Sequence, residues 1–213
     1  MKRSSLLLAG GLGARLNGRE KALMMYQDNT LLERTLAVLD EVSDEVIVSL
    51  RDSEQVRQFS EYLVDRKVVT DKIKNAGPLA GMLAGFEEAC GDYVFTVACD
   101  MPFLNGQLID MMFNMVEEHD ALIPISEYGT KEPLHSVYHK DKMLVAIEHT
   151  MGEGHRSILA PVSSLDDVLY LDADVMKKID KGLKSFVNIN IPSDMTKLDN
   201  VNHENLDDND SSA

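Results

Sequence analysis

Short apolar runs alternate with segments of helical period along this chain, as in repeated strand–helix units. The runs that predict strands are Ser4 to Ala9, Glu45 to Leu50, Lys67 to Thr70, Tyr93 to Ala98, Ala121 to Ile125, Leu134 to His139 and Val168 to Leu171. A helix is predicted to begin at Thr30, and four more are predicted over Ser53 to Leu63, Pro78 to Cys90, Asn105 to Glu118 and Lys142 to Thr150. A short helix is predicted to begin in the segment His155 to Leu159. The run Tyr93 to Ala98 is continuously apolar, as expected for a central strand covered on both faces of the sheet.

This order predicts an α/β fold with three layers: a mostly parallel, Rossmann-like central sheet between helices, and a small mixed C-terminal part. Thr30-x-x-Glu33 has the form of a capping box, and Asn105 is a good N-cap for its helix. We expect one domain over 1–198, with irregular chain at Phe186 to Ile191 and a helix at Ser193 to Leu198. The Asp- and Asn-rich segment 199–213 is predicted to be an acidic disordered tail.

Composition and charge limit which partners and which cell compartment are expected for the protein. The net charge of -15 argues against nucleic-acid binding, which needs a basic face, but leaves phosphate ligands open. No run is long enough for a membrane span, and Leu6-Leu7-Leu8 fits a buried strand better than a signal peptide. Cys90 and Cys99 are too few for a disulfide framework, and both are expected in apolar surroundings. We therefore expect a cytoplasmic protein with no membrane association.

A glycine-rich segment follows the first predicted strand. It contains Gly10, Gly11 and Gly13, with Arg15 and Lys21 further on. Glycines let a backbone approach a phosphate closely, and the two basic side chains would offset its charge. The segment is neither a P-loop nor a dinucleotide fingerprint. A plain strand–helix turn with solvated basic residues is the alternative interpretation.

Four motifs in order resemble one family. L-A-G-G-x-G-x-R-L-x-G-x-x-K resembles the triphosphate loop of nucleotidyltransferases that make nucleotide-sugars. The segments Gly77 to Gly81 (GPLAG), Asp100 to Leu104 (DMPFL) and Asn188 to Pro192 (NINIP) resemble those of the molybdenum cofactor guanylyltransferases, the MobA family. The resemblance implies a nucleotide-diphospho-sugar transferase-like fold.

Asp100 follows the predicted central strand Tyr93 to Ala98, at the edge where open α/β sheets bind ligands. A carboxylate there suits Mg²⁺, which takes one or two protein oxygens and fills its other positions with phosphate and water. The alternative, an N-cap, is met better by Asn105. Asp71 ends the third strand and is either a turn residue or an acceptor for the guanine N1–H and 2-amino group.

The family resemblance then assigns the remaining site residues. Catalysis is expected from Lys21, Arg15 and Asp100, with the metal on Asp100. The residues expected to bind the nucleotide are Leu8, Ala9, Gly10, Gly11, Gly13, Lys21, Ser49, Asp71, Gly77, Pro78 and Asp100. Those expected to bind the acceptor are Leu79, Gly81, Arg156, Asn188 and Asn190, although Arg156 is equally consistent with a surface arginine.

Two positions depart from the family pattern, since Glu20 stands where Asp is frequent and Ser49 where Asn is frequent. The base preference is therefore less secure than the reaction class. The expected reaction moves GMP from GTP to molybdopterin (or Mo-molybdopterin), with Mg²⁺ as cofactor and pyrophosphate as product. We expect a monomer or weak homo-oligomer in transient contact with molybdenum enzymes or other cofactor-biosynthesis proteins. The alternatives are transfer from CTP, another acceptor such as a cobalamin precursor or sugar phosphate, and a non-catalytic nucleotide-binding adaptor.

Overall fold

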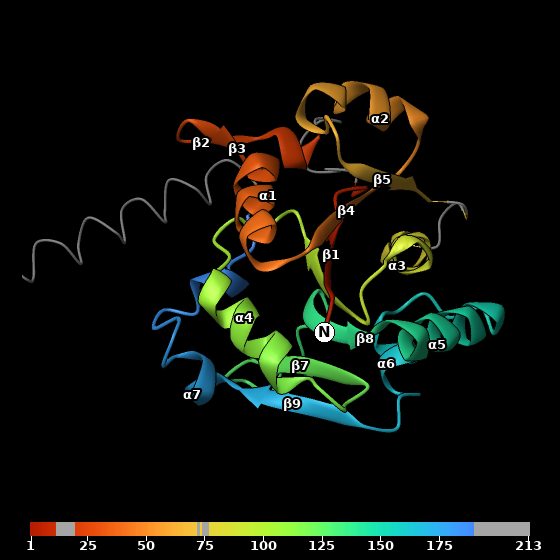
Figure 1. The fold of residues 1–213 in the computed structure, drawn as a ribbon, viewed down its shortest axis with the longest axis vertical. Helices are drawn as coiled ribbons and strands as arrows, with labels where there is room; N and C mark the ends of the chain where they lie inside the picture. Colours follow the sequence, from red (N-terminus) through yellow and green to blue (C-terminus); the bar gives the residue numbers. More distant parts are fainter. Residues whose placement is uncertain (12–19, 72, 74–76, 190–213) are drawn as a thin grey trace, which may run out of the picture.

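The computed structural model describes residues 1–11, 20–71, 73 and 77–189. Within them, a central sheet has the strand order β5-β4-β1-β6-β8-β7-β9 (Figure 1). These strands are β1 (Arg3–Leu8), β4 (Glu45–Leu50), β5 (Lys67–Thr70), β6 (Tyr93–Ala98), β7 (Ala121–Ile125), β8 (His135–His139) and β9 (Val168–Asp172). Every pairing is parallel except those of β8, which runs antiparallel to β6 and β7. The predicted mostly parallel sheet is confirmed.

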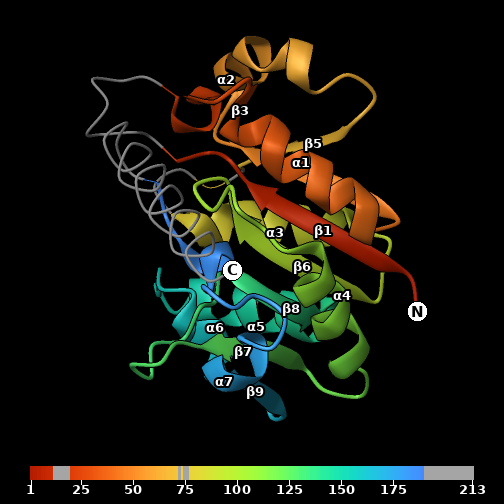
Figure 2. The same ribbon diagram turned by 90° about the vertical axis from the view of Figure 1, so that its left-hand side faces the viewer.

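Helices cover both faces of the sheet, which gives the predicted three layers (Figures 1 and 2). On one face lie α1 (Leu31–Val42) and α4 (Gly106–Met115), and on the other α3 (Pro78–Glu88), α5 (Lys140–Gly152) and α6 (Leu159–Val162). The shorter elements are α2 (Ser53–Gln58), α7 (Ala173–Met176), the 3-10 helices η2 (Lys21–Leu23), η3 (Ser60–Tyr62) and η4 (Lys184–Phe186), and the hairpin strands β2 (Met25–Tyr26) and β3 (Asn29–Thr30). In the part of the chain that is described, no helix is both long and apolar enough to cross a bilayer.

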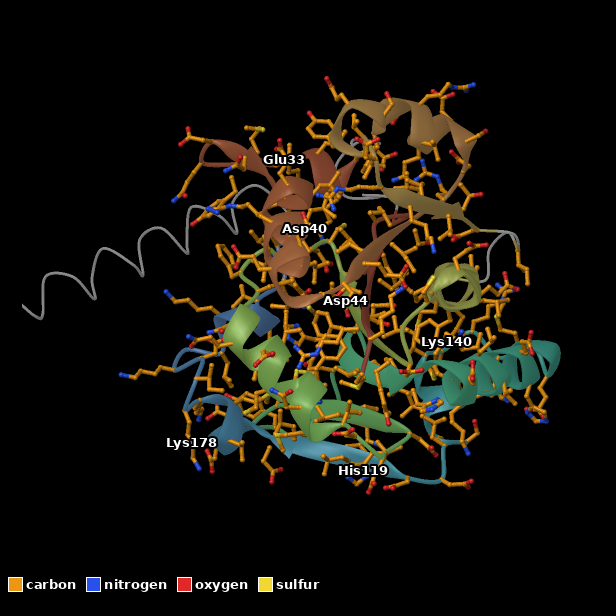
Figure 3. The ribbon with its side chains drawn as sticks, viewed as in Figure 1. Glu33, Asp40, Asp44, His119, Lys140 and Lys178 are labelled. Atoms are coloured by element: carbon orange, nitrogen blue, oxygen red, sulfur yellow. The ribbon has the colours of Figure 1, made fainter. Side chains whose placement is uncertain are left out.

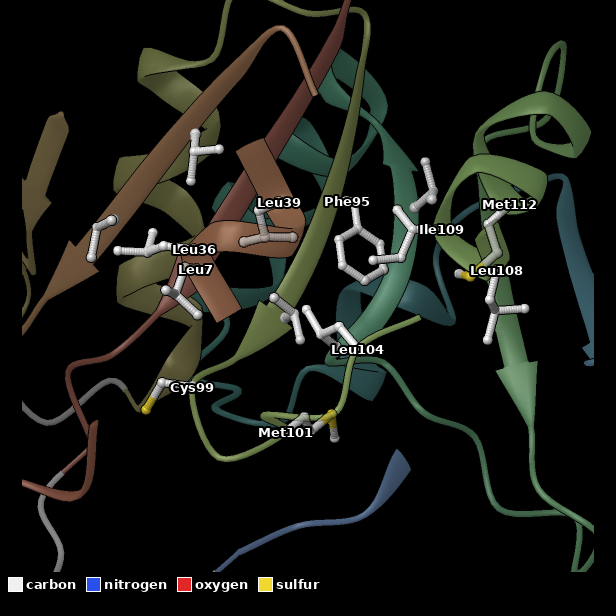
Figure 4. Packing of buried hydrophobic residues seen from close by; sticks show 14 of the residues in the cluster. Leu7, Leu36, Leu39, Phe95, Cys99, Met101, Leu104, Leu108, Ile109 and Met112 are labelled. Carbon is white, nitrogen blue, oxygen red and sulfur yellow. The ribbon is translucent and has the colours of Figure 1, made fainter. Parts of the chain in front are cut away.

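The continuous apolar run of β1 follows from these layers. Leu7 packs with Leu36 and Leu39 of α1 in the core shown in Figure 4. Its neighbour Leu6 points the other way and packs with Phe86 of α3. Because successive strand residues face opposite sides of a sheet, a strand between two helical layers needs apolar residues at both.

Local signals fix the start of both helices on the first face. Thr30 Oγ1 accepts a hydrogen bond from Glu33 N, and the Glu33 carboxylate accepts one from Thr30 N, so the predicted capping box is confirmed. Figure 3 shows Glu33 at this end of α1, with Asp40 further along the helix. Asn105 caps α4, where its side chain accepts from two backbone N–H groups. Caps satisfy donors that a helix start leaves unpaired.

Several expectations were wrong in detail. The helix predicted over Ser53 to Leu63 ends at Gln58, because Phe59 leaves helical geometry (φ -96°, ψ 0°) and is fully buried in the core. Cys90 lies beyond the end of α3 and is exposed, so its expected apolar environment was wrong, whereas Cys99 is buried. Strands β2 and β3 and helix α7 were not predicted, since two to four residues are too few to show a period.

Candidate active site

Parallel strands bring residues far apart in sequence to one edge of the sheet. β1, β4, β5 and β6 are mutually parallel, so their carboxyl ends coincide. Lateral pairing aligns Leu8 with Ser49 and with Ala98, and Asp100 follows shortly after β6. The predicted residues on these strands therefore share one edge, where open α/β sheets bind ligands.

Lys21 and Asp100 form an ion pair at this edge. Lys21 Nζ lies 2.8 Å from Asp100 Oδ2, and the two side chains are 14% and 25% exposed. The second carboxylate oxygen, Oδ1, is buried and has no hydrogen-bond partner among the described residues. The Asp100 backbone is held as well, because its carbonyl accepts from Ile189 N at 2.8 Å. The structure thus brings together two of the three predicted catalytic residues.

The environment of Asp100 Oδ1 indicates whether this site suits a metal ion. A buried carboxylate oxygen without a donor is costly unless a cation or another donor binds it. Among the described residues, no group of three or more His, Cys, Asp or Glu side chains could hold a metal by itself. Asp100 therefore fits a hard cation that takes most of its ligands from phosphate and water, as Mg²⁺ does.

A second group surrounds Gly81 in α3. A Cβ at Gly81 would lie 2.5 Å from Ser49 Oγ, 3.0 Å from Leu8 Cδ2 and 3.3 Å from Asp71 Oδ1. Three predicted residues, from three different strands or their ends, thus meet around a fourth, Gly81. Burial raises the pKa of Asp71 to about 6, although the Ser49 hydroxyl and the Arg51 charge oppose this shift. Gly81, expected on the acceptor side, lies against residues expected to bind the nucleotide.

The start of α3 needs glycine. Gly77 has φ 65° and ψ -153°, a region that residues with a Cβ rarely adopt, and Pro78 follows at the first helical position. A Cβ at Gly77 would lie 4.0 Å from the Arg156 carbonyl oxygen, so the backbone at Arg156 is beside the helix start. The Arg156 side chain is exposed. The role of Arg156 in binding the acceptor therefore stays a prediction.

The glycine segment begins where β1 leaves the sheet. Ala9 N donates to Ser49 O, and a Cβ at Gly10 would lie 3.0 Å from Arg51 N, while a Cβ at Gly11 would have no described atom within 4 Å. Gly10 therefore permits a close backbone approach. Gly13 and Arg15, and Asn190 near the other end of the chain, lie outside the described residues.

Two further acceptor candidates differ in exposure. The Leu79 side chain is fully buried in the core, so only its backbone can face the edge. Asn188 is exposed and precedes the buried Ile189, which packs against Tyr26 and Leu31. The Ile189–Asp100 hydrogen bond puts Asn188 and Ile189, the described part of the NINIP motif, beside the candidate residue Asp100.

Sequence reasoning missed Arg51 and Gln55, which contact both described ends of the glycine segment. Glu20, noted only as a departure from the family pattern, binds both of them. The pattern Asp52-x-x-Gln55 indicates only the N-cap of a helix. It does not predict a contact with residues more than thirty positions earlier in the chain.

Fold and site together define an α/β nucleotidyltransferase. The family model described as the MobA-like NTP transferase domain matches residues 5–168. The chain belongs to this MobA-like family.

Individual relatives agree with this assignment. A Methanosarcina mazei protein named "Probable molybdenum cofactor guanylyltransferase" is 41% identical over 201 residues, which cover 92% of this chain and 89% of the relative. The molybdenum cofactor guanylyltransferase of Pseudomonas entomophila is 32% identical over 73% of this chain and 79% of its own. The crystal structure of molybdopterin-guanine dinucleotide biosynthesis protein A from Archaeoglobus fulgidus superposes with a TM-score of 0.80 at 28% identity, covering 94% of this chain and 99% of that one.

Proposed function

We propose that the protein transfers GMP from GTP to molybdopterin, or to its molybdenum-loaded form, and releases pyrophosphate. The main support for this proposal is the ion pair between Lys21 and Asp100. It lies at the same sheet edge as the two described ends of the glycine segment. The relatives named for the guanylyltransfer reaction cover about nine-tenths of the chain. They favour GTP and molybdopterin over CTP, another acceptor or a non-catalytic adaptor.

In the proposed reaction, a terminal phosphate oxygen of molybdopterin attacks the α-phosphorus of GTP in line. The new P–O bond forms as the bond from the α-phosphorus to the bridging β-phosphate oxygen breaks, and pyrophosphate leaves with that electron pair. The attacking oxygen is already anionic, so no general base is needed. Catalysis then depends on positioning the two substrates and on stabilising the negative charge of the leaving pyrophosphate.

Each site residue has a proposed role. Lys21 binds the phosphates that become pyrophosphate, and Arg15, outside the described residues, adds positive charge there. Asp100 would hold Mg²⁺, with its buried Oδ1 free of any described hydrogen-bond donor. When bound, Mg²⁺ supplies positive charge that stabilises the developing phosphate charge. Ser49 and Asp71 bind the guanine edge, and Gly77 and Pro78 present the positive end of α3 to the nucleotide.

We place the acceptor at Leu79, Gly81, Arg156, Asn188 and Asn190, the last of which lies outside the described residues. Gly81 and Leu79 act here through backbone, since one lacks a side chain and the other is buried. We further propose that the protein works in the cytoplasm, which agrees with its two free cysteines, and that it meets other cofactor-biosynthesis proteins or molybdenum enzymes only transiently.

The reaction is tested with purified protein, Mg·GTP and molybdopterin, measuring pyrophosphate and the guanine dinucleotide product. Asp100→Asn is expected to lower kcat by at least about a hundredfold, because the neutral amide is a poor metal ligand. Asp110→Asn is the matched control, since Asp110 pairs with Arg3 on the surface of α4. If the Asp100→Asn variant is folded and turns over at a near-normal rate, Asp100 is not the metal ligand.

The base preference has a separate test. GTP should raise the melting temperature of the wild-type protein in the presence of Mg²⁺ more than CTP does at equal concentration, because a ligand that binds the folded state stabilises it by RT ln(1 + [L]/Kd). Equal shifts would contradict guanine selectivity while leaving the reaction class in place.

A further inference from the structure

Gln55 joins the two described ends of the glycine segment. The residue is fully buried near the start of α2. Its Nε2 donates to Ala9 O at 2.9 Å, where the segment begins, and to Glu20 Oε2 at 2.8 Å, where it ends. Its Oε1 accepts from Arg51 N at 2.7 Å, so the amide is engaged on both sides. A buried amide with three such bonds is costly to displace.

Arg51 makes the same bridge from the end of β4. Arg51 Nη2 lies 2.9 Å from Glu20 Oε1, and Nη1 lies 3.5 Å from Gly10 O. Arg51 Nε also donates to Asp52, the residue that caps α2 through Gln55 N. Each Glu20 carboxylate oxygen therefore has one donor, and the Glu20 side chain is only 11% exposed.

The next residue after Glu20 is Lys21, which starts η2 and reaches Asp100. Fixing the Glu20 carboxylate from two sides restricts the backbone that carries Lys21. We propose that Glu20, Arg51 and Gln55 form a loop clamp, a set of positioning residues that hold Ala9, Gly10 and Lys21 in place to bind the leaving pyrophosphate. This inference rests on the proposed function.

The hydrogen bonds of the loop clamp differ from those of the base site. Ser49 and Asp71 lie against Gly81, whereas Arg51 and Gln55 donate to Ala9, Gly10 and Glu20. Arg51 also acts on the base site through its charge, which opposes the rise that burial causes in the pKa of Asp71. Loss of the loop clamp should therefore weaken binding of the phosphate half of the nucleotide and spare the guanosine half. A general loss of structure would weaken both.

The main test compares Glu20→Ala and Arg51→Met with the wild-type protein. Calorimetry measures the affinity for Mg·pyrophosphate and, separately, for GMP, and urea unfolding checks that each variant is folded. We expect pyrophosphate affinity and kcat/KM for GTP to fall at least about tenfold, since small displacements of positioned groups are costly to catalysis. At pH 8, where Asp71 is ionised in the wild type and in both variants, GMP affinity and KM for molybdopterin should stay within about twofold.

Controls come from the same helix. Glu54 and Arg57 form an exposed ion pair on α2 that makes no contact with the glycine segment among the described residues. Glu54→Ala and Arg57→Met should leave pyrophosphate affinity and turnover unchanged. Glu20→Gln keeps the shape of Glu20 without its charge, and it should shift pyrophosphate affinity in the same direction by less. It also tests the inference if Glu20→Ala does not fold.

A double variant tests the linkage through Glu20. If Arg51 acts through Glu20, then Glu20→Ala with Arg51→Met should cost little more in kcat/KM than the larger single change. The proposal is overturned if folded Glu20→Ala binds pyrophosphate like the wild type, or if pyrophosphate and GMP affinities fall together. A wild-type protein that binds neither Mg·GTP nor pyrophosphate would instead refute the proposed function.

Discussion

Asp71 is half-buried beside Ser49, and burial raises its pKa to about 6. A carboxyl with a raised pKa binds its proton more tightly in the folded state than in the unfolded chain, where an ordinary Asp titrates near 3.9. The folded state therefore gains stability from this group as the pH falls from about 6 towards that ordinary value, and loses the gain as the pH rises through 6.

Guanine binding has the opposite dependence on this proton, because only the ionised carboxylate accepts from both N1–H and the 2-amino group. We predict that GTP affinity falls about tenfold per pH unit once the pH is well below 6. Asp71→Asn should bind GTP weakly without this pH dependence, and should be more stable than the wild type above pH 6. Titration calorimetry between pH 5 and 8 measures the first effect and urea unfolding the second. A wild-type affinity that stays flat across this range would contradict the role of Asp71.

Gly81 has no space for a side chain. We predict that Gly81→Ala loses about 1–3 kcal/mol of stability, since its Cβ would overlap Ser49 Oγ, and that its KM for GTP rises because Ser49 and Asp71 must move. Gly85→Ala is the matched control on the same helix, because the three atoms nearest to its Cβ all belong to Leu6 in the core. It should lose stability while its KM for GTP is unchanged. Equal KM changes in both variants would show that Gly81 has no special link to the nucleotide.

At the scale of elements, helix α3 starts with a backbone geometry that only glycine adopts readily. Gly77→Ala should cost about 1–3 kcal/mol of unfolding free energy, because φ 65° with ψ -153° strains any residue with a Cβ. Gly152→Ala, at the end of α5 in open space, should be neutral or slightly stabilising. Urea unfolding compares them. A Gly77→Ala variant as stable as Gly152→Ala would mean that the start of α3 does not need glycine.

Element boundaries show where local sequence suffices. β4, β5, β6 and β7 have the predicted bounds, since each is a compact apolar run between polar turns. α1 starts where its capping box predicts, because that signal is contained within four residues. The end of α2 was missed because it depends on the burial of Phe59 against residues distant in sequence.

At the scale of the whole molecule, the sheet separates two apolar cores. Ile109 of α4 and Ile147 of α5 are both fully buried, one in each core. We predict that Ile109→Val and Ile147→Val each cost about 1 kcal/mol, and that the double variant costs their sum within about 0.5 kcal/mol, because the sites share no partner. Urea unfolding of the three variants measures this. A larger coupling would show that the sheet transmits packing strain between the layers.

The sequence by itself determined the layered α/β fold, the sheet edge where the candidate residues lie and the identity of most of those residues. These follow from periodicity, from the rule that parallel strands end together, and from four short motifs in order. Tertiary structure alone decided that Asp100 pairs with Lys21 and keeps one oxygen unpartnered, that Gly81 packs against Ser49 and Asp71, and that Gln55 and Arg51 bind Glu20. The physical reason is that contact distance and burial depend on side chains from separate strands, whose relative placement no local pattern records.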